Sequence, residues 1–564
     1  MSTNTAPAAS AAEQVKLKSR HLRGTIIEEF ALETDSFTKE TVQILKFHGA
    51  YQQNDRDARK TGQPAPVGSM VRVGVAGGIL TPEQYLALDR MADEAGDGTL
   101  RVTSRQDIQF HRVAKTRLRP LIRLLNENLL TTLAACGDAV RNVVCCPAPL
   151  GGSWRDAALS QALELSRSLK PATRAYYEIW LDGEKAAAAR PAEEDVEPLY
   201  GPAYLPRKFK IGFAAPGDNC IDVYTNDIGI VPLCRADGLE GYTVLAGGGL
   251  GVSPGVKATH PRLADPFCTV APGELLDLVC AIVTVHRDLG NRTNRKLARL
   301  KYVIDELGMD RFRAEVEGRF GRKLRDPAPL EWSEGHDHLG WHPQGDGRWF
   351  LGVRVHDGRI QDGDGLKLRS ALREVISNGV TGVRLTPQQN VLLAGIRAED
   401  RAGIESALKT AGSRFAESLP PVFRHSMACP ALPTCGQAIT EAERVSPEVL
   451  ADIDARLREA GLAEEEITVR LTGCSNGCAR PLTAEIGLVG QSVNMYIIYL
   501  CGSRLGTRLA EQYATNVPRA EIGKRLVPVL GLFLEQRLAG ERFGDFCHRV
   551  GIAALRATTP VEVA

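Results

Sequence analysis

The spacing of hydrophobic positions divides much of the chain into short strands and amphipathic helices. Residues 71–75 are typical of a strand, and the run Thr81-Pro82-Glu83-Gln84 predicts the start of a helix. Threonine is a good N-cap, proline suits the first helical position, and glutamine follows three residues after the cap. Two further strands are predicted at 100–103 and 108–113, followed by a helix over about 116–130. The pattern therefore predicts an α/β fold.

The same order of elements returns about 283 residues later. Val353-Arg354-Val355 repeats Val71-Arg72-Val73, a helix is predicted over about 366–377, and residues 383–390 repeat 100–107. Cys146-Pro147 falls in register with Cys429-Pro430. Similarity at a near-constant offset is the signature of an internal duplication. The chain is thus predicted to hold two copies of a small and a larger α/β unit, packed about a pseudo-twofold axis.

The predicted boundaries follow from this repeat. Residues 1–68 form a flexible N-terminal arm, since 1–20 is polar and expected to be disordered and 21–68 is rich in charged and amide side chains. The paired small units occupy 69–136 and 340–412, and the larger units occupy 137–330 and 413–564. The segment 325–345 is rich in proline, glycine and aspartate. Its histidines, His336, His338 and His342, are interpreted as a solvated loop, because no cysteine or acidic ligand set has a matching spacing.

Composition excludes several classes of protein. The chain has 564 residues, 43% hydrophobic and 24% charged, with a formal net charge of +1. Bulk attraction to nucleic acid or to an anionic membrane is therefore not indicated. The N-terminal residues show no apolar signal segment, and no run of some eighteen apolar residues occurs. Thirteen cysteines in such a chain predict a cytoplasmic protein that uses thiols for metal or redox chemistry.

Two short cysteine motifs lie near the C-terminal end. Cys429 and Cys435 are separated by five residues, and Cys474 and Cys478 by three, with glycine and proline in both loops. Four thiolates suit either a 4Fe-4S cluster or a structural zinc ion. The spacing favours the cluster, because zinc sites usually show C-x2-C or C-x4-C pairs and neither loop has that spacing. Unrelated buried thiols are a weaker alternative, since both pairs lie on turn-forming segments.

The first copy carries basic residues where the second carries the cysteines. Lys208 and Lys210 alternate, so both ammonium groups lie on one face of an extended segment. Ordinary surface charge is the better interpretation for any single arginine, but the set favours a polyanionic ligand. The set consists of Arg72, Arg101, Arg105, Arg141, Arg207, Lys208 and Lys210.

At these residues the chain resembles the siroheme-dependent sulfite and nitrite reductases. Within them it is most similar to the hemoprotein (beta) subunits of assimilatory NADPH-sulfite reductases. The resemblance spans almost the whole chain, through HLRGTIIEEF, KFHGAYQQNDRD, RNVVCCPAP, YLPRKFKIGF, HSMACPALPTC and TGCSNGCARPLTAEIGLVG. It implies two ferredoxin-like half-modules and two larger siroheme- and cluster-binding modules.

The resemblance also implies roles for individual residues. Cys429, Cys435, Cys474 and Cys478 match the ligands of a 4Fe-4S cluster, and Cys478 matches the axial ligand of the siroheme iron. Arg72, Arg141, Lys208 and Lys210 match the residues that bind the substrate anion and supply protons. Arg101, Arg105, Gln109 and Asn476 match positions that contact the siroheme or its pocket. Arg299 is assigned there too, although relatives are expected to have lysine at this position.

The implied activity is the six-electron reduction of sulfite to sulfide in sulfur assimilation and cysteine biosynthesis. Reduction of nitrite to ammonia is the close alternative, and a non-catalytic metal-cluster protein that binds nucleic acid is a remote one. No nicotinamide- or flavin-binding segment is evident, because the glycine-rich run 246–251 does not fit a dinucleotide fingerprint. Electrons are therefore expected from a flavoprotein (alpha) subunit, which takes them from NADPH, or from ferredoxin.

Overall fold

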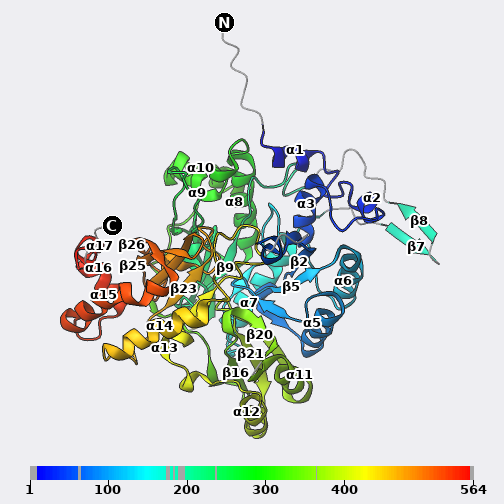
Figure 1. Cartoon of the computed structure of the whole chain (residues 1–564). Helices are drawn as coiled ribbons and strands as arrows, with labels where there is room; N and C mark the ends of the chain where they lie inside the picture. Colours follow the sequence, from blue (N-terminus) through cyan, green and yellow to red (C-terminus); the bar gives the residue numbers. More distant parts are fainter. Residues whose placement is uncertain are drawn as a thin grey trace.

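The computed structural model describes residues 9–60, 65–172, 178–181, 184–188, 197–235, 238–363 and 365–558. Two small and two large α/β units alternate along the chain (Figure 1). The α/β fold with an internal duplication is confirmed, since each unit of one copy has a counterpart with the same strand order in the other.

The two small units are five-stranded sheets that exchange an edge strand. The first sheet has the order β1-β2-β5-β4-β17, and the second β15-β16-β21-β20-β3. Strand β3 of the first copy thus pairs with β20 of the second, and β17 of the second copy pairs with β4 of the first. The strands are β1 (Ala50–Asn54), β2 (Val67–Val73), β3 (Ile79–Leu80), β4 (Leu100–Val102), β5 (Ile108–Val113), β15 (Gly340–Pro343), β16 (Trp349–Val353), β17 (Arg359–Ile360), β20 (Gly382–Leu385) and β21 (Val391–Ile396).

Four helices pack on these sheets. They are α5 (Pro82–Ala95), α6 (Lys115–Glu127), α11 (Leu368–Gly379) and α12 (Arg401–Thr410). Thr81 and Gln84 form the predicted capping box at the start of α5. Figure 1 shows α5 of the first half-module beside α11 of the second. Leu88 of α5 and Leu372 of α11 belong to one continuous apolar core, so the two half-modules form a single folded body.

The two large units have matching mixed sheets. The orders are β13-β12-β11-β9-β6 and β26-β25-β24-β23-β22, and in each sheet three parallel strands are followed by two antiparallel ones. The first contains β6 (Val144–Cys145), β9 (Ile211–Phe213), β11 (Ile228–Arg235), β12 (Gly238–Ala246) and β13 (Asp265–Val270). The second contains β22 (Ser426–Ala428), β23 (Val469–Thr472), β24 (Ile486–Ser492), β25 (Met495–Leu500) and β26 (Glu511–Pro518).

Helices cover both large sheets. The longer ones are α7 (Ser153–Ser168), α8 (Leu275–Leu289), α9 (Leu300–Leu307), α10 (Met309–Phe320), α14 (Ser446–Glu459), α15 (Ile522–Gln536) and α16 (Phe543–Val550). The apolar face of α15, including Leu526 and Phe533, is buried in the core of the second unit. Ligand sites in such sheets form where the parallel strands end, and both cysteine loops begin there.

The N-terminal segment differs from the predicted flexible arm. Residues 9–60 form α1 (Ala11–Leu17), α2 (Ile26–Phe30) and α3 (Lys39–Leu45), and β1 adds an edge strand to the first half-module. The Lys16 ammonium group is buried, where it pairs with Glu13 and donates to the Leu205 carbonyl at 2.7 Å. Partners far along the chain therefore order a segment whose own composition is polar. Residues 1–8 of the predicted disordered tail lie outside the described residues.

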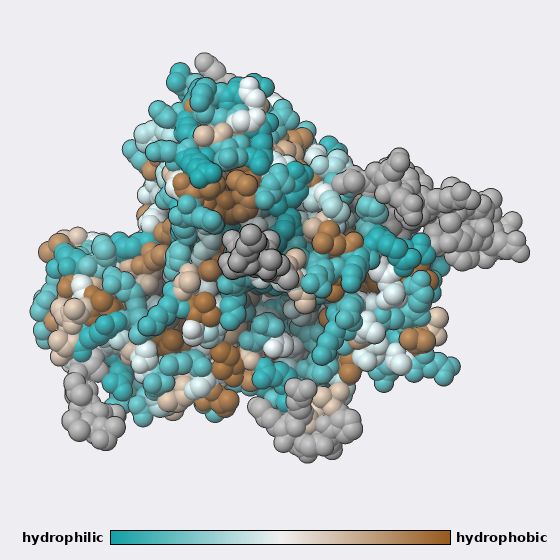
Figure 2. Space-filling model, turned by 90° about the horizontal axis from the view of Figure 1, so that it is seen from above, coloured by the Kyte–Doolittle hydropathy of each residue, from teal (hydrophilic) through white to brown (hydrophobic). Residues whose placement is uncertain are grey.

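The predicted solvated histidine loop is wrong for one of its three members. His336 is exposed, His342 is half-buried in β15, and His338 is only 6% exposed. Elsewhere the surface mixes polar and apolar residues, as one face shows in Figure 2. Within the described parts of the chain, every helix is too short or too polar to cross a membrane.

Candidate functional site

The four cysteines of the C-terminal motifs lie together. Cys429 directly follows β22, and Cys474 and Cys478 follow β23, the neighbouring parallel strand. Burial and the adjacent Cys478 raise the pKa of Cys474 to about 11, and the same two causes raise the pKa of Cys429 well above its usual range. Burial, followed by the effect of Cys478, also raises the pKa of Cys435. Metal binding at such a group of thiols releases their protons and holds them as thiolates.

Hydrogen-bond donors surround this group. The Gly473 N–H points at Cys429 Sγ at 3.4 Å, and the Asn476 Nδ2 points at Cys474 Sγ at 3.4 Å. Cys429 and Cys474 are buried, whereas Cys478 is exposed and faces the basic side of the first copy. The site thus has a closed side with two buried thiols and an open side at Cys478.

The basic side contains two lysines without partners. Among the described residues, the Lys208 and Lys210 ammonium groups have no hydrogen bond or ion pair. Burial, followed by the charges of Arg207 and Arg299, lowers the pKa of Lys208 to about 7. Burial and Lys208 lower that of Lys210 well below its usual range. Half-buried cations without counter-ions are costly, so this arrangement indicates a site for an anion.

Two arginines border the same space. With its amide oriented to satisfy both groups, Gln109 accepts from Arg72 Nη2 at 2.6 Å. Burial acts to lower the pKa of Arg72, but Cys136, Asp107 and Cys478 outweigh it and the pKa is raised. Arg141 donates from Nε to the Gly137 carbonyl at 2.9 Å, which fixes its guanidinium.

Arg105 and Arg299 are tied into the first large unit. Arg105 donates to Asn226 Oδ1 at 2.9 Å and to the Ile211 carbonyl at 3.0 Å, while its Nε has no partner among the described residues. Arg299 forms a two-pronged pair with Asp227, with Nη2 to Oδ2 at 2.7 Å. Asp227 also accepts the Lys210 N–H at 2.8 Å. Arg299 therefore helps to position the lysine strand.

Arg101 reaches in the other direction. It is 1% exposed, forms an ion pair with Glu443, and donates to the Ala428 carbonyl at 3.1 Å, next to Cys429. Arg359 of β17 also pairs with Glu443, with Nε to Oε1 at 2.8 Å. The first half-module thereby holds the strand end that carries a cluster cysteine.

The glycine-rich segment after β12 packs against the second cysteine loop. Val252 N–H donates to the Ser475 carbonyl at 3.0 Å, and Ser475 Oγ donates to the Val252 carbonyl at 2.8 Å. Lys301 secures the segment by donating to the Gly249 carbonyl at 2.9 Å. This contact explains why the run 246–251 serves the cysteine site instead of forming a dinucleotide fingerprint.

One buried acid of the site was missed by the sequence analysis. Asp107 is 1% exposed, and burial raises its pKa to about 6 against the opposing effect of Arg72 and Arg105. Its only sequence signal was its place in the repeated run, where Asn390 is its counterpart. A carboxyl group among arginines balances part of the positive charge of the basic side.

The residues present fit an iron–sulfur cluster beside a polyanionic macrocycle. Four converging thiols and two N–H donors suit a 4Fe-4S cluster. The basic side supplies unpaired lysines and arginines suited to carboxylates and to an oxyanion. The thiols belong to the second copy and the basic residues to the first, and the two sets meet at Cys478.

Comparison with known proteins identifies the family. The "Nitrite and sulphite reductase 4Fe-4S domain" matches residues 162–324, and the "Nitrite/Sulfite reductase ferredoxin-like half domain" matches 62–128 and 342–411. A ferredoxin sulfite reductase of Synechococcus elongatus is 43% identical, covering 97% of this chain and 90% of its own. An NADPH sulfite reductase hemoprotein beta-component of Xylella fastidiosa is 43% identical over 97% of both chains.

A second beta-component, from Geobacillus kaustophilus, is 41% identical, covering 96% of this chain and 95% of its own. In three dimensions, the NirA protein of Mycobacterium tuberculosis covers 97% of this chain and 98% of its own, with a TM-score of 0.79 and 24% sequence identity. That likeness supports the fold. The half-domain matches agree with the two ferredoxin-like half-modules, and with the near-full-length relatives they show that this chain belongs to the nitrite and sulphite reductase family.

Proposed function

We propose that this oxidoreductase reduces sulfite to sulfide with six electrons. The observation that carries the proposal is the pair Lys208 and Lys210, whose ammonium groups have no partner in the described part of the chain and lie beside Cys478 of the four-cysteine group. An anion with several oxygens needs both charge neutralisation and proton delivery, and this side of the site offers both.

The cofactors are a siroheme and a 4Fe-4S cluster. Cys429, Cys435, Cys474 and Cys478 would hold the cluster, and Cys478 would also bind the siroheme iron. The exposure of Cys478 toward the basic side, unlike the buried Cys429 and Cys474, supports this double role. When bound, the two groups supply an iron coordination site and a route for single-electron transfer.

The protein's own residues would bind the substrate and hold protons. Arg72 and Arg141 would orient the oxyanion by hydrogen bonds from guanidinium groups whose positions Gln109 and Gly137 fix. Lys208, with a pKa of about 7, is suited to give up a proton near neutral pH. Lys210 lies on the same face and would deliver the second proton for each departing oxygen.

Other basic residues would receive the carboxylates of the siroheme. We assign Arg105 and Asn476 to contacts with the siroheme pocket. Arg105 Nε has no partner among the described residues, and Asn476 lies in the second cysteine loop. Arg101 and Arg299 are already paired with Glu443 and Asp227, so we assign them to positioning the site's walls. Gln109 acts indirectly, by holding the Arg72 guanidinium in place.

The electron donor is a separate protein in this proposal. Relatives named for NADPH and for ferredoxin are about equally similar to this chain, so both a flavoprotein subunit and ferredoxin remain candidates. We place the docking surface on the N-terminal segment 9–60, which packs on the outside of the first half-module.

Lys210→Met tests the acid role. Removal of a positioned acid is expected to lower kcat with sulfite by about 10²- to 10⁴-fold, with little change in the visible spectrum of the bound cofactors. Lys323→Met is the matched control, because Lys323 is an exposed lysine of the same unit, and it should retain full turnover. Unchanged turnover in Lys210→Met would remove Lys210 from the mechanism.

Steady-state rates with sulfite and nitrite as sole acceptors test the substrate. A higher kcat/KM for sulfite is expected. A preference for nitrite would replace the proposed activity by ammonia formation, while leaving the site assignment intact.

A further inference from the structure

The duplication leaves a second pair of cysteines at the positions of the cluster cysteines. Cys146 follows β6 as Cys429 follows β22. Cys220 precedes the short helix 223–225 by three residues, as Cys478 precedes the short helix 481–483. The first copy therefore retains two of the four thiol positions, in a part of the molecule that the catalytic site does not use.

Two further ligand-type side chains complete this group. One ligand atom each from Cys146, Asp218, Cys220 and His338 lies within 4.8 Å of all the others. His338 Nε2 is 3.9 Å from Cys146 Sγ and 3.6 Å from Asp218 Oδ2. Ligand atoms about 2.0–2.3 Å from a tetrahedral zinc ion lie about 3.3–3.8 Å from one another. The observed separations are close to this range without any rearrangement of the backbone.

Neighbouring groups hold these ligands in place. Asp218 Oδ1 accepts the N–H groups of His336 and Cys220, each at 3.0 Å, which leaves Oδ2 for the group's centre. His338 is held in the left-handed region with φ of 56°, a conformation that costs about 1 kcal/mol or more and persists where surrounding structure enforces it. The adjacent Asp337 is anchored by Arg424, with Nε to Oδ2 at 2.6 Å.

The chemistry of the group suits a borderline-soft cation. Thiolate, imidazole and carboxylate together are a zinc donor set. Arg384 lies near Cys146 and would offset the negative charge of two thiolates and a carboxylate around one divalent ion.

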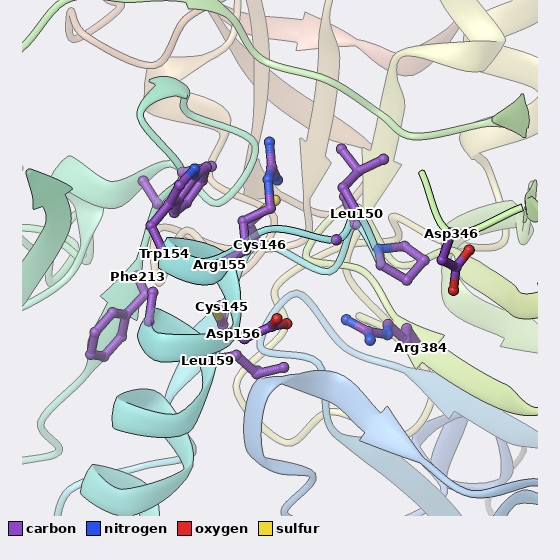
Figure 3. Close-up of a pocket in the computed structure, with 16 residues that line it drawn as sticks. Cys145, Cys146, Leu150, Trp154, Arg155, Asp156, Leu159, Phe213, Asp346 and Arg384 are labelled. Carbon is purple, nitrogen blue, oxygen red and sulfur yellow. The ribbon is translucent and has the colours of Figure 1, made fainter. Parts of the chain in front are cut away.

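The group also has an approach from solvent. Cys146 lines a cavity of about 300 Å³ with Trp154, Arg155 and Arg384 (Figure 3). One ligand thus borders the cavity, and two others, Cys220 and His338, are buried.

We propose that Cys146, Asp218, Cys220 and His338 bind one zinc ion. The site is structural: it ties the connection between the two copies, through His338, to the strand ends of the first large unit. It is independent of the proposed sulfite reduction, because its residues contact none of the catalytic lysines. The sequence spacing concealed it, since His338 lies 192 residues from Cys146.

Metal analysis of the purified holoprotein tests the proposal. We expect about one zinc per chain, in addition to iron, by mass spectrometry. Zinc-edge X-ray absorption, which is blind to the iron centres, should show two sulfur neighbours at about 2.3 Å and two nitrogen or oxygen neighbours at about 2.0 Å. Because this second measurement uses the unaltered protein, it does not depend on whether variants fold.

Paired variants locate the ion. His338→Gln and Cys220→Ser should lose the zinc, whereas His336→Gln and Cys234→Ser should retain it, since His336 and Cys234 are exposed and outside the group. A wild-type protein that holds no zinc after incubation with zinc chloride would overturn the proposal. Equal zinc loss from His336→Gln and His338→Gln, or a Cys146–Cys220 disulfide in the native protein, would do the same.

Discussion

At the scale of single residues, the site is distinguished by charges that lack partners. Most buried ionised groups in the described chain are satisfied, as Arg299 is by Asp227 and Arg101 by Glu443. Lys208 and Lys210 are half-buried, and among the described residues their ammonium groups have no partner. Since burial of an unpaired charge opposes folding, this arrangement agrees with the proposed binding of an anion.

Glu443 provides a test at this scale. It pairs with Arg101 and Arg359, so Glu443→Gln leaves a guanidinium that is 1% exposed without its counter-ion. Breaking one side of a buried pair costs about 3–5 kcal/mol. The expected results are a lower urea midpoint and less bound iron per chain, because Arg101 also holds the carbonyl before Cys429.

Glu441→Gln is the control for that substitution. Glu441 lies two residues away and pairs with the exposed Arg444, where ion pairs contribute about 0–1 kcal/mol. An equal loss of iron in both variants would show that the Arg101 pair does not position the cluster strand.

At the scale of elements, α1 shows how a polar helix becomes part of the fold. Lys16 of α1 faces Asp138 at 3.5 Å, and Arg295 pairs with the same carboxylate at 2.6 Å. The opposing effect of burial is outweighed by Arg295 and Lys16, so the pKa of Asp138 falls to about 2. The ionised carboxylate therefore stabilises the docked helix.

This pKa predicts how attachment of α1 depends on pH. A carboxyl group with a lowered folded-state pKa stabilises the fold above its unfolded value, near 4, and that stabilisation is lost as the pH falls toward about 2. Hydrogen-exchange protection of α1 amides in the wild type should fall over this window. In Asp138→Asn the protection of the α1 amides at neutral pH should be about 2 kcal/mol lower than in the wild type. It should also be nearly independent of pH.

Asp326→Asn is the comparison, since Asp326 is 96% exposed. Protection of α1 in this variant should follow the wild-type curve. Wild-type protection that stays constant down to pH 2 would contradict the role of Asp138.

At the scale of the whole molecule, the two copies are joined around a buried carboxylate. Asp222 of the first large unit accepts from Arg470 Nη1 at 2.7 Å and pairs with Arg480 of the second. Arg480 also donates to the Ser104 carbonyl at 3.1 Å and the Pro387 carbonyl at 3.0 Å. These carbonyls lie in the β4–β5 loop of the first half-module and the β20–β21 loop of the second. All four units therefore meet at this network.

Asp222→Asn tests the network. The substitution leaves two buried guanidinium groups without a counter-ion, with an expected loss of about 3–5 kcal/mol. Calorimetry should show a lower Tm, with separation of the single transition as the copies come apart. Asp265→Asn, at a half-exposed ion pair with Arg262, should leave the transition unchanged.

The sequence alone determined the duplication, most element positions and the clustered cysteines. These are local signals, because the cap of α5 and the two thiol pairs in short loops each depend on residues that are close together in the sequence. The sequence also showed the set of basic residues, and the resemblance implied their individual roles, but their arrangement around Cys478 depends on two copies folding face to face.

Only the tertiary structure decided what depends on distant partners. The exchange of β3 and β17, the docking of α1 through Asp138, and the meeting of His338 with Cys146 join residues far apart along the chain. Periodicity and composition report a residue's neighbours in sequence, whereas burial of a charge or convergence of ligands depends on which segments the fold places beside it. For that reason the sequence indicated a solvated loop at His338, and the folded chain buries that side chain among thiols and a carboxylate.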